Sequence, residues 1–467
     1  MNLAQELQGI VGKDRVATGL PVRRGYSQDA SESPPRIPAV VVFPADVEEV
    51  VRIVKLANKR CAPLTPVVAR TNNWGLHIAL KGGIAVDLSG MNRILEVNEE
   101  VRTMVVEPGV TVAGAYAEAE RRNLLLSIPK SCPAESSIMA NLLIDGVGSL
   151  LLKFGPQSQL INGLEAVLPN GELLRCGSCA SGPYWFSRVP LPDLVGLFTG
   201  WHGATGIVTK IGFPIFPKPK HRGVICFGLE GGAGDGFTGW LSSLVDLDVA
   251  DDIALFTPNA GKFVSGDLKG REAGVSLFAY ALVSGPSTEM IELKKKELAL
   301  ASQDRQVGGR TVRRLELSER DQKDYLSYPN PRRDFKRESF VGSTPTAYLP
   351  VSEWGDVMKQ VEGVCRKAGK KTEFRLGVMK GSLHGPVMAY VHFDREDRDD
   401  MSAVRQLVRD VVRIYVDHGG LVWKAPPWAW KMQAGEGNLG EIVNKIKRAL
   451  DPKGIMAPGR LDLSGRK

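Results

Sequence analysis

The stretch from Ile128 to Gly155, IPKSCPAESSIMANLLIDGVGSLLLKFG, has a composition suited to close approach by a ligand. Ser136, Ser137 and Asn141 can donate and accept hydrogen bonds, and small residues leave the backbone between them uncovered, namely Ala134, Ala140, Gly146 and Gly148. Uncovered backbone N–H groups can reach the phosphates or the ring system of a ligand. The alternative is a glycine-containing loop between core elements, and this stretch alone leaves both interpretations open.

Metal-ligand chemistry has weak support in the sequence. Cys176 and Cys179 form the one close cysteine pair, and they follow a turn at Pro169–Glu172 instead of opening a helix. No second pair or nearby histidine completes a zinc-type ligand set, so unpaired structural thiols are expected. His384 and His392 share one face of an expected strand but stand too far apart for a single ion. We therefore predict no metal site.

The composition is that of an ordinary soluble globular protein, with 467 residues, 43% apolar and 24% charged. A chain of this length is expected to form two or three domains. The net charge of +8 favours anionic small molecules, acidic protein partners or a membrane surface, whereas no nucleic-acid motif accompanies the basic residues. No apolar run is long enough to cross a bilayer, and the first 15 residues lack a signal-peptide core, so a cytoplasmic location is expected.

The first half of the chain alternates between strand and helix patterns. Val40–Phe43 is an apolar β-branched run, and a capping box at Asp46 and Glu49 opens a helix with apolar residues at helical spacing. Further expected strands and helices follow in order: strands at 63–68, 84–88, 94–97, 102–106, 164–168, 173–175 and 206–211, and a helix at 112–122. The loop Arg70–Gly75 stands between two of these strands.

The second half begins after Pro217–Pro219, a proline-rich segment that favours a domain boundary. Gly231–Gly236 lacks the GxGxxG spacing and is interpreted as a connector. Residues 305–337 are polar and basic, and a solvated loop is the expected form, although the segment could cover an anionic ligand or contact a partner. Further expected elements are helices at 286–301, 354–368, 401–418 and 438–450 and strands at 224–229, 343–349 and 387–393.

The motifs together resemble a family: the FAD-linked oxidoreductases of the vanillyl-alcohol oxidase / p-cresol methylhydroxylase superfamily, which includes glycolate and D-lactate dehydrogenases. The resemblance rests on the order and spacing of several segments. They are Pro38–Pro44 with its helix, Val86–Ser89 with Met91–Asn92, Val105–Val110, Ile128–Gly155, Leu168–Glu172, Gly203–Thr209 and Asp451–Gly459. Each segment alone is a weak signal, whereas their combination across residues 38–220 and the C-terminal tail is specific.

The resemblance implies an α+β fold, in which a PCMH-type FAD-binding domain of two α+β subdomains is joined to an α+β cap (substrate) domain. The implied boundaries are an N-terminal arm at 1–36, the FAD-binding domain at 37–220, the cap at 221–430 and a C-terminal segment at 431–467 that returns to the FAD-binding domain. The implied FAD-binding residues are Arg70, Thr71, Asn72, Asn73, Gly75, Pro133, Ala134, Glu135, Ser136, Ser137, Ala140, Asn141, Gly146, Gly206, Ile207 and Val208. The 70–75 loop is usually glycine-rich in the family, but here Gly75 is its only glycine.

The implied substrate site lies in the cap. Phenol-oxidising members carry a Tyr-Arg pair after the long C-terminal helix, and the matching positions here are Trp423 and Lys424. A cation beside an aromatic ring suits an anionic, possibly planar substrate, although Trp423 could equally be a core residue. Arg375 is a second candidate for anion binding, and His392 is a candidate base, with a packed strand residue as its alternative. The metal-binding histidine motif of the hydroxy-acid branch is replaced by GPVMAYV.

The implied function is an FAD-dependent dehydrogenase that moves hydride from a small anionic hydroxy compound, such as a 2-hydroxy acid, to flavin. No His or Tyr stands between residues 335 and 347, where covalently flavinylated relatives attach FAD, so non-covalent FAD is expected. Electrons would pass to an acceptor protein carrying haem, an iron–sulfur cluster or flavin, within an oligomer or complex. The alternatives are an oxidase or dehydrogenase of 4-substituted phenols, and a non-catalytic flavoprotein subunit.

Overall fold

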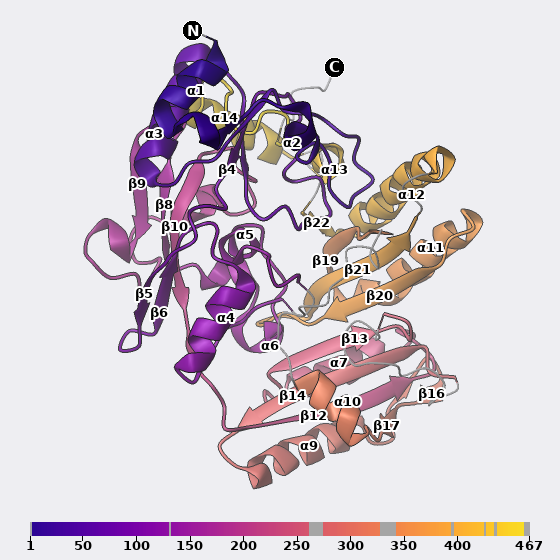
Figure 1. Ribbon diagram of the computed structural model, residues 1–467. Coiled ribbons are helices and arrows are strands. Elements are labelled where there is room, and N and C mark those ends of the chain that lie inside the picture. The colour runs from indigo at the N-terminus through magenta and orange to yellow at the C-terminus, as the bar shows by residue number, and fades with distance from the viewer. Residues whose placement is uncertain are drawn as a thin grey trace.

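Three sheets organise the molecule. In a computed structural model the chain is described over residues 2–129, 132–260, 274–326, 342–393, 397–424, 426–433 and 437–461. The described strands form a four-stranded, a five-stranded and a nine-stranded sheet, with smaller two-stranded pairs. Figure 1 shows the first two sheets with their helices on one side and the nine-stranded sheet with its helices on the other. The predicted α+β fold is confirmed.

The four-stranded sheet contains the N-terminal strands in the order β1-β2-β4-β3, with β2, β4 and β3 parallel. Its elements are β1 (Val16–Ala17), β2 (Val40–Val42), β3 (Leu64–Val67) and β4 (Ile84–Asp87), with helices α1 (Leu3–Val11), α2 (Leu20–Arg24) and α3 (Val47–Arg60). The expected helix after Asp46 is present, and Asp46 caps it by accepting from the Glu49 amide. The Glu49 carboxylate instead accepts from Ala45 N and pairs with Arg15, so only half of the predicted capping box forms.

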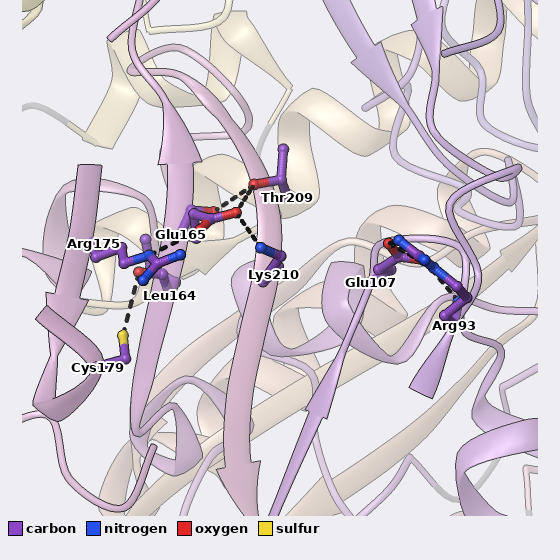
Figure 2. A network of polar contacts seen from close by, with 8 residues as sticks. All are labelled: Arg93, Glu107, Leu164, Glu165, Arg175, Cys179, Thr209 and Lys210. Carbon is purple, nitrogen blue, oxygen red and sulfur yellow. Dashed lines mark hydrogen bonds and ion pairs between the residues drawn. The ribbon is translucent and has the colours of Figure 1, made fainter. Parts of the chain in front are cut away.

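The five-stranded sheet is antiparallel and has the order β5-β6-β10-β8-β9. Its elements are β5 (Ile94–Asn98), β6 (Thr103–Val106), β8 (Gly163–Val167), β9 (Leu173–Gly177) and β10 (Ile207–Pro214), with helix α4 (Val112–Arg121) packed against it and β7 (Leu124–Leu125) paired with β11 (Phe216–Pro217) nearby. Figure 2 shows the fully buried Glu165 of β8 reaching Arg175 and Lys210 on the strands at either side, at 2.9 Å each. A buried carboxylate is stable there because cations from both neighbours compensate it.

Two short helices lie within the stretch Ile128–Gly155, for which the sequence suggests either backbone open to a ligand or a glycine-containing loop between core elements. They are α5 (Ile138–Leu143), capped by Ser137, and α6 (Leu151–Phe154). The apolar residues Ile138, Met139 and Leu142 bury themselves in the core of the five-stranded sheet. Burial of this apolar face explains why a segment rich in small residues folds as a helix.

The nine-stranded antiparallel sheet has the order β17-β12-β14-β13-β20-β21-β19-β22, and β18 also pairs with β21. Its strands are β12 (His221–Leu229), β13 (Asp252–Phe256), β14 (Leu277–Gly285), β17 (Arg313–Leu315), β18 (Gly342–Ser343), β19 (Thr346–Pro350), β20 (Thr372–Gly377), β21 (His384–His392) and β22 (Leu421–Trp423). The other elements of the second half are α7 (Phe237–Val245), α9 (Thr288–Ser302), β15 (Gln306–Val307), β16 (Arg310–Thr311), α10 (Glu319–Leu326), α11 (Trp354–Lys367), α12 (Arg398–Asp417), α13 (Pro427–Gln433) and α14 (Leu439–Leu450). Of these, α14 lies beside the N-terminal helices (Figure 1).

Alternation along these strands separates the two faces of the nine-stranded sheet. Phe374 and Leu376 of β20 pack in one core with residues of α7, α9, α11 and α12. Side chains of opposite parity point to the other face, where residues such as Tyr280 and Tyr390 contact Leu125 and Leu150 from the first half of the chain. This second face therefore looks toward the first half.

The segment after α14 packs back on the four-stranded sheet. The Leu64 amide donates to Ile455 O and the Ala457 amide donates to Leu64 O, both at 2.7 Å. Ile455 and Met456 belong to the same core as β2, β3 and β4. Residues near position 460 are thereby placed beside the loop that follows β3.

The basic segment 305–337 differs from the expected solvated loop over its described part. Residues 306–326 contain the short strands β15, β16 and β17 and the helix α10, and β17 extends the nine-stranded sheet beside β12. Positions 327–337 lie outside the described residues. The predicted connector Gly231–Gly236 does link β12 to α7.

Candidate active site

A cavity of about 560 Å³ lies between the first half of the chain and the nine-stranded sheet. One side, here called the loop wall, consists of lining residues from positions 24–30, 66–77, 129–147 and 198–208. The other side, the sheet wall, consists of Thr344, Arg375, Met388, Tyr390, Trp423 and Lys424. The predicted cofactor and substrate segments therefore meet in a single hollow.

The loop after β3 lines this cavity and contains backbone amides without an acceptor in the described part of the chain. Ala69 and Arg70 take left-handed φ angles of 56° and 54°, which turn the backbone sharply. The amides of Thr71, Asn72 and Asn73 have no acceptor among the residues that the structure describes, whereas Trp74 N and Leu76 N donate to the Asn72 side chain. Consecutive unpaired amides of this kind form a concave site for an anion.

The side chains of this loop have structural partners. The Asn72 amide nitrogen lies 3.1 Å from His77 Nδ1, and Asn73 donates to Thr344 Oγ1 at 3.1 Å. Trp74 Nε1 also donates to Thr344 O. The two asparagines, predicted as ligand donors, therefore hold the loop and tie it to the sheet wall.

Gly75 does not line the cavity, and its backbone is hydrogen-bonded to residues near both ends of the described chain. Its N–H donates to Asp29 Oδ2 at 2.6 Å, and its carbonyl accepts from Arg460 Nη2 at 2.7 Å. A Cβ at Gly75 would come within 2.6 Å of Ser33 Oγ, and its φ is +72°. Arg460 is 3% exposed, and burial lowers its pKa to about 10. Glycine is therefore required here for backbone approach and conformation.

The predicted segment 133–146 contributes through only part of its length. Pro133, Ser136, Ser137, Ala140 and Asn141 line the cavity, and Ser136 Oγ is 2.9 Å from Thr71 Oγ1. Ala134, Glu135 and Gly146 do not line it. A Cβ at Gly146 would meet Gln157 Oε1 at 2.1 Å, so this glycine permits internal packing.

The segment 202–208 adds His202, which sequence reasoning missed. Gly206 and Val208 line the cavity as predicted, whereas Ile207 is fully buried in the core of the four-stranded sheet. His202 Nδ1 is buried without a hydrogen-bond partner in the described part of the chain, and burial lowers the pKa of the ring to about 3. A neutral imidazole with an unpaired ring nitrogen therefore faces the hollow.

The sheet wall follows from strand alternation. Arg375 in β20 is paired in register with Met388 in β21, and Tyr390 is two residues further on the same face. All three line the cavity, and Arg375 also hydrogen-bonds Tyr390. His392 shares this parity but is exposed at the end of β21 and does not line the cavity. Of the two predicted cap residues, Arg375 therefore lies at the cavity and His392 lies outside it.

Trp423 and Lys424 form the corner of the sheet wall. Trp423 Nε1 donates to Ile144 O at 2.9 Å, and its ring stacks on Tyr348 at 6.0 Å between centroids. The Lys424 ammonium lies 3.8 Å from the Trp423 ring centroid and 4.2 Å from that of Trp74. Trp423 is thus both a buried packing residue and a lining residue, which unites the two alternative interpretations of this position.

Lys424 is a buried cation without a carboxylate partner among the described residues. Burial lowers its pKa to about 7, with Asp145 opposing and Arg375 reinforcing that shift. Asp145 is already engaged, since it accepts from Tyr348 OH at 2.8 Å. Cations held against indole faces remain available to an anion, and the low dielectric of a buried position strengthens that attraction.

Metal and thiol features lie elsewhere. The described residues contain no group of three or more His, Cys, Asp or Glu side chains that could hold a metal ion. Cys176 and Cys179 are buried free thiols near β9, and Figure 2 shows Cys179 directed at Leu164 O. Burial raises their pKa values to about 12 and 11, which keeps both thiols protonated.

Several lining residues had no signal in the sequence. Thr344 lies between β18 and β19, Met388 and Tyr390 belong to a strand whose pattern shows only burial, and Asp29 and Arg460 act through the backbone of Gly75. His202 had a usable signal, because it stands directly before the recognised Gly203–Thr209 segment and is a polar residue next to glycine. A search for polar residues beside such motifs would have found it.

Comparisons with known proteins are consistent with this geometry. Residues 38–177 match the family described as "FAD binding domain", and residues 326–461 match "FAD linked oxidases, C-terminal domain". The chain is 25% identical over 451 residues to the glycolate oxidase subunit GlcD of Bacillus subtilis (strain 168), covering 93% of this chain and 91% of that protein. It is 29% identical over 183 residues to a D-lactate dehydrogenase of Anaerostipes hadrus, covering 39% and 37% of the two chains.

The fold is shared with a solved structure. The crystal structure of p-cresol methylhydroxylase with substrate bound aligns with a TM-score of 0.85 at 20% identity, covering 99% of this chain and 97% of that chain. At 20% identity this comparison shows that the fold is shared. No helix in the described part of the chain is both long and apolar enough to cross a membrane.

Proposed function

Because the chain belongs to the FAD-linked oxidases of the p-cresol methylhydroxylase / vanillyl-alcohol oxidase superfamily, and so is an FAD-dependent oxidoreductase, we propose that it is a dehydrogenase of a small anionic hydroxy compound. The proposed substrate class is a 2-hydroxy acid of the glycolate or lactate type. The names of the relatives, a glycolate oxidase subunit and a D-lactate dehydrogenase, support this class.

The observation that carries the substrate proposal is Lys424. A buried ammonium that faces a cavity without a partner is costly unless a ligand supplies the opposite charge. An anionic substrate would supply that charge, with Arg375 as a second anchor on the same wall. The carboxylate of a 2-hydroxy acid fits this requirement.

The loop wall fits FAD. The free amides of Thr71, Asn72 and Asn73 suit the pyrophosphate, and the unpaired His202 Nδ1 supplies a further acceptor or donor in the hollow. Ser136, Ser137, Ala140 and Asn141 present short side chains along the same wall. We assign these residues, with Gly206 and Val208, to cofactor binding, and we assign Gly75, Gly146 and Ile207 to the support behind them.

The mechanism divides between the two walls. FAD held at the loop wall would supply the acceptor for the hydride that leaves the substrate carbon bearing the hydroxyl. Lys424 binds the substrate carboxylate, and the Trp423 and Trp74 indoles fix the ammonium and exclude water from it. The bonds of Trp423 to Ile144 and of Trp74 to Thr344 fix both rings, so the anion is held in one orientation relative to the loop wall.

A second candidate substrate class is the 4-substituted phenol. Trp74, Trp423 and Tyr390 line the same hollow as Lys424, and such aromatic walls suit a planar phenolate as well as an aliphatic acid. Oxidation would then start at the benzylic carbon.

Non-covalent FAD is retained as part of the proposal. Cys132 lines the cavity, but burial raises its pKa to about 12, so the thiol stays protonated and is a poor nucleophile. Both ring nitrogens of His77 have partners, Asn72 and Gln28 O. Acid precipitation of the purified protein tests this point, because non-covalent flavin leaves the pellet colourless.

The substrate proposal is tested by anaerobic reduction of the holoenzyme. A panel of glycolate, D- and L-lactate, 2-hydroxyglutarate and 4-alkylphenols is mixed with the protein, and bleaching of the flavin bands is followed. Lys424→Met is expected to keep FAD bound and to lower the second-order rate of reduction by about 100-fold, the scale for loss of a buried charge contact. Lys380→Met, at an exposed cap lysine, is the matched control.

Each outcome is informative. Absence of flavin bands in the purified protein would contradict the cofactor assignment. Bleaching by phenols alone would select the second class, and equal rates for Lys424→Met and Lys380→Met would remove Lys424 from the substrate site.

The electron acceptor is proposed to be a partner protein. The relative from Bacillus subtilis is named as a subunit, which supports membership of a complex. A cytoplasmic location and an acceptor that carries haem, an iron–sulfur cluster or flavin complete the proposal.

A further inference from the structure

A second hollow of about 530 Å³ opens beside the N-terminal arm, α12 and α13. We call it the basic groove, because five of its lining residues are cations: Arg36, Lys81, Arg405, Arg409 and Lys431. All five are exposed. Its one acidic lining residue, Glu32, is only 5% exposed. The groove therefore presents a concentrated positive charge to solvent.

The five cations form no ion pair with a carboxylate in the described part of the chain. Arg405 donates through Nε to the backbone oxygen of Glu32, which fixes its direction without neutralising it. Arg405 and Arg409 stand one turn apart on α12, a spacing at which like charges repel and destabilise a helix. Five cations, two of which repel each other on one helix, lack carboxylate partners among the described residues, which indicates that the groove binds an anion.

The groove also carries an aromatic anchor. Arg409 lies 4.7 Å from the centroid of the half-buried Trp428 ring, and Pro34, Pro426 and Pro427 form rigid edges nearby. Arginine and tryptophan are the residues most enriched at the energetic centre of protein interfaces. The cations come from the arm, from the loop after His77 and from two helices, a spread that suits an extended acidic surface better than one small anion.

The groove and the active-site cavity share their walls. In three places, one chain segment lines both hollows. Residues 28–30, 76–77 and 423–424 line the cavity, and the residues shortly after them, 32–34, 80–81 and 426–428, line the groove. Arg460, which holds Gly75, directly follows Gly459 of the groove. An acceptor seated in the groove would thus stand behind the chain segments that enclose the cavity.

We propose that the basic groove is the docking site for an acidic electron-accepting protein. The inference rests on the proposed function, in which electrons leave the flavin for a partner. Oxidation of one hydroxy compound to its carbonyl yields two electrons and two protons. Two one-electron acceptors, or one two-electron acceptor, take the electrons, and the protons pass to solvent.

The experiment uses plastocyanin, a small acidic copper protein that accepts one electron, as the probe. The holoenzyme is photoreduced anaerobically without substrate, mixed with oxidised plastocyanin in a stopped-flow instrument, and the loss of the copper colour is followed. Photoreduction makes the result independent of the substrate class. A wrong substrate assignment would therefore leave this reaction intact.

The test variant is Arg409→Glu/Lys431→Glu, and the control is Lys296→Glu/Lys359→Glu, which makes the same change in net charge at exposed lysines of α9 and α11. We expect the second-order rate constant at low salt to fall about tenfold or more in the groove variant and by less than about twofold in the control. The difference should shrink at about 0.5 M salt, because screening weakens exposed charges. The milder Arg409→Gln/Lys431→Gln should show the same direction.

Equal effects in the groove and control variants, or a wild-type rate that does not change with salt, would overturn the proposal. So would saturation of the groove by inorganic triphosphate without any slowing of the plastocyanin reaction, because that outcome assigns the groove to small anions.

Discussion

The loop wall and the sheet wall of the cavity are built on different principles. The loop wall uses contiguous backbone, such as the amides of Thr71, Asn72 and Asn73, and its side chains mostly hold the loop in shape. The sheet wall uses single side chains from separate places, including Arg375 in β20, Tyr390 in β21 and Lys424 directly after β22. Substitution of a loop-wall side chain should leave the backbone contacts in place, provided that distant residues still hold the loop in its conformation. Substitution of a charged residue in the sheet wall removes its contact directly. The following predictions test that contrast.

Arg460→Ala should have the largest effect, and it should fall on cofactor binding. It removes the donor to two buried carbonyls, Gly75 O and Ile78 O, and the buried cation that interacts with Asp29. Loss of a buried charge partner costs about 3–5 kcal/mol, so FAD affinity should fall by about 100-fold or more. FAD titration of the apoprotein and thermal melting measure it.

The control for this variant is Lys453→Ala, in the same C-terminal segment, where an exposed ammonium bonds Asn58. It should leave FAD affinity within about twofold, as expected of surface substitutions. Normal FAD affinity in Arg460→Ala would show that the loop wall needs no remote support.

The pH profile should be set by the sheet wall. Since the pKa of Lys424 is lowered to about 7, its charged form is present below pH 7 and is lost as pH rises through 7. For an anionic substrate, kcat/KM should be flat below this point and fall about tenfold per pH unit above it. Lys424→Arg, which stays protonated, should retain activity to higher pH. A flat wild-type profile up to pH 9 would contradict this role.

His202→Gly should have an intermediate effect. Glycine removes the ring but keeps the left-handed φ of 49°, so backbone strain does not confuse the result. Loss of one buried hydrogen bond to the cofactor should weaken FAD binding by about tenfold. His202→Asn, which tolerates the same φ and keeps a polar group, should lose less. Fluorescence titration with FAD separates the two variants, and equal affinity to wild type would place Nδ1 outside the cofactor site.

Cys176→Ala/Cys179→Ala should have the smallest effect on activity. Both thiols are buried and protonated, and both lie outside either wall. We expect kcat/KM within about twofold of wild type and a loss of about 1–2 kcal/mol in the free energy of unfolding. Metal analysis of the purified protein is the companion measurement, and zinc in the wild type that disappears in the variant would reverse the structural interpretation.

More of the loop wall than of the sheet wall could be predicted from the sequence. Apolar periodicity and capping identified α3, α4, α11, α12 and α14 and most strands of the first two sheets, because those signals are local. The short helix α5 escaped because its apolar face is apparent only when the core of the five-stranded sheet is known. The roles of Asn72 and Asn73 escaped because their partners, His77 and Thr344, are tertiary.

The sequence indicated the sheet wall only at Trp423 and Lys424, through their match to the Tyr-Arg pair of the resembled family, and at Arg375, a second candidate for anion binding. Met388 and Tyr390 resemble ordinary strand residues, and only the register between β20 and β21 shows that one face is open to a cavity. His392 illustrates the reverse error, since correct parity did not bring it to the hollow. Position along a strand matters as much as the face.

The fastening of Gly75 between Asp29 and Arg460 has a consequence for biosynthesis. A nascent chain synthesised as far as residue 208 already contains every segment of the loop wall. The hydrogen bond from Arg460 to Gly75 O can form only after residue 460 has left the ribosome. Stable capture of the flavin is thus coupled to synthesis of residues separated by more than 380 positions, a pairing of high contact order that folds slowly. We therefore expect stable FAD binding only after the segment around Arg460 has packed beside the loop that follows β3.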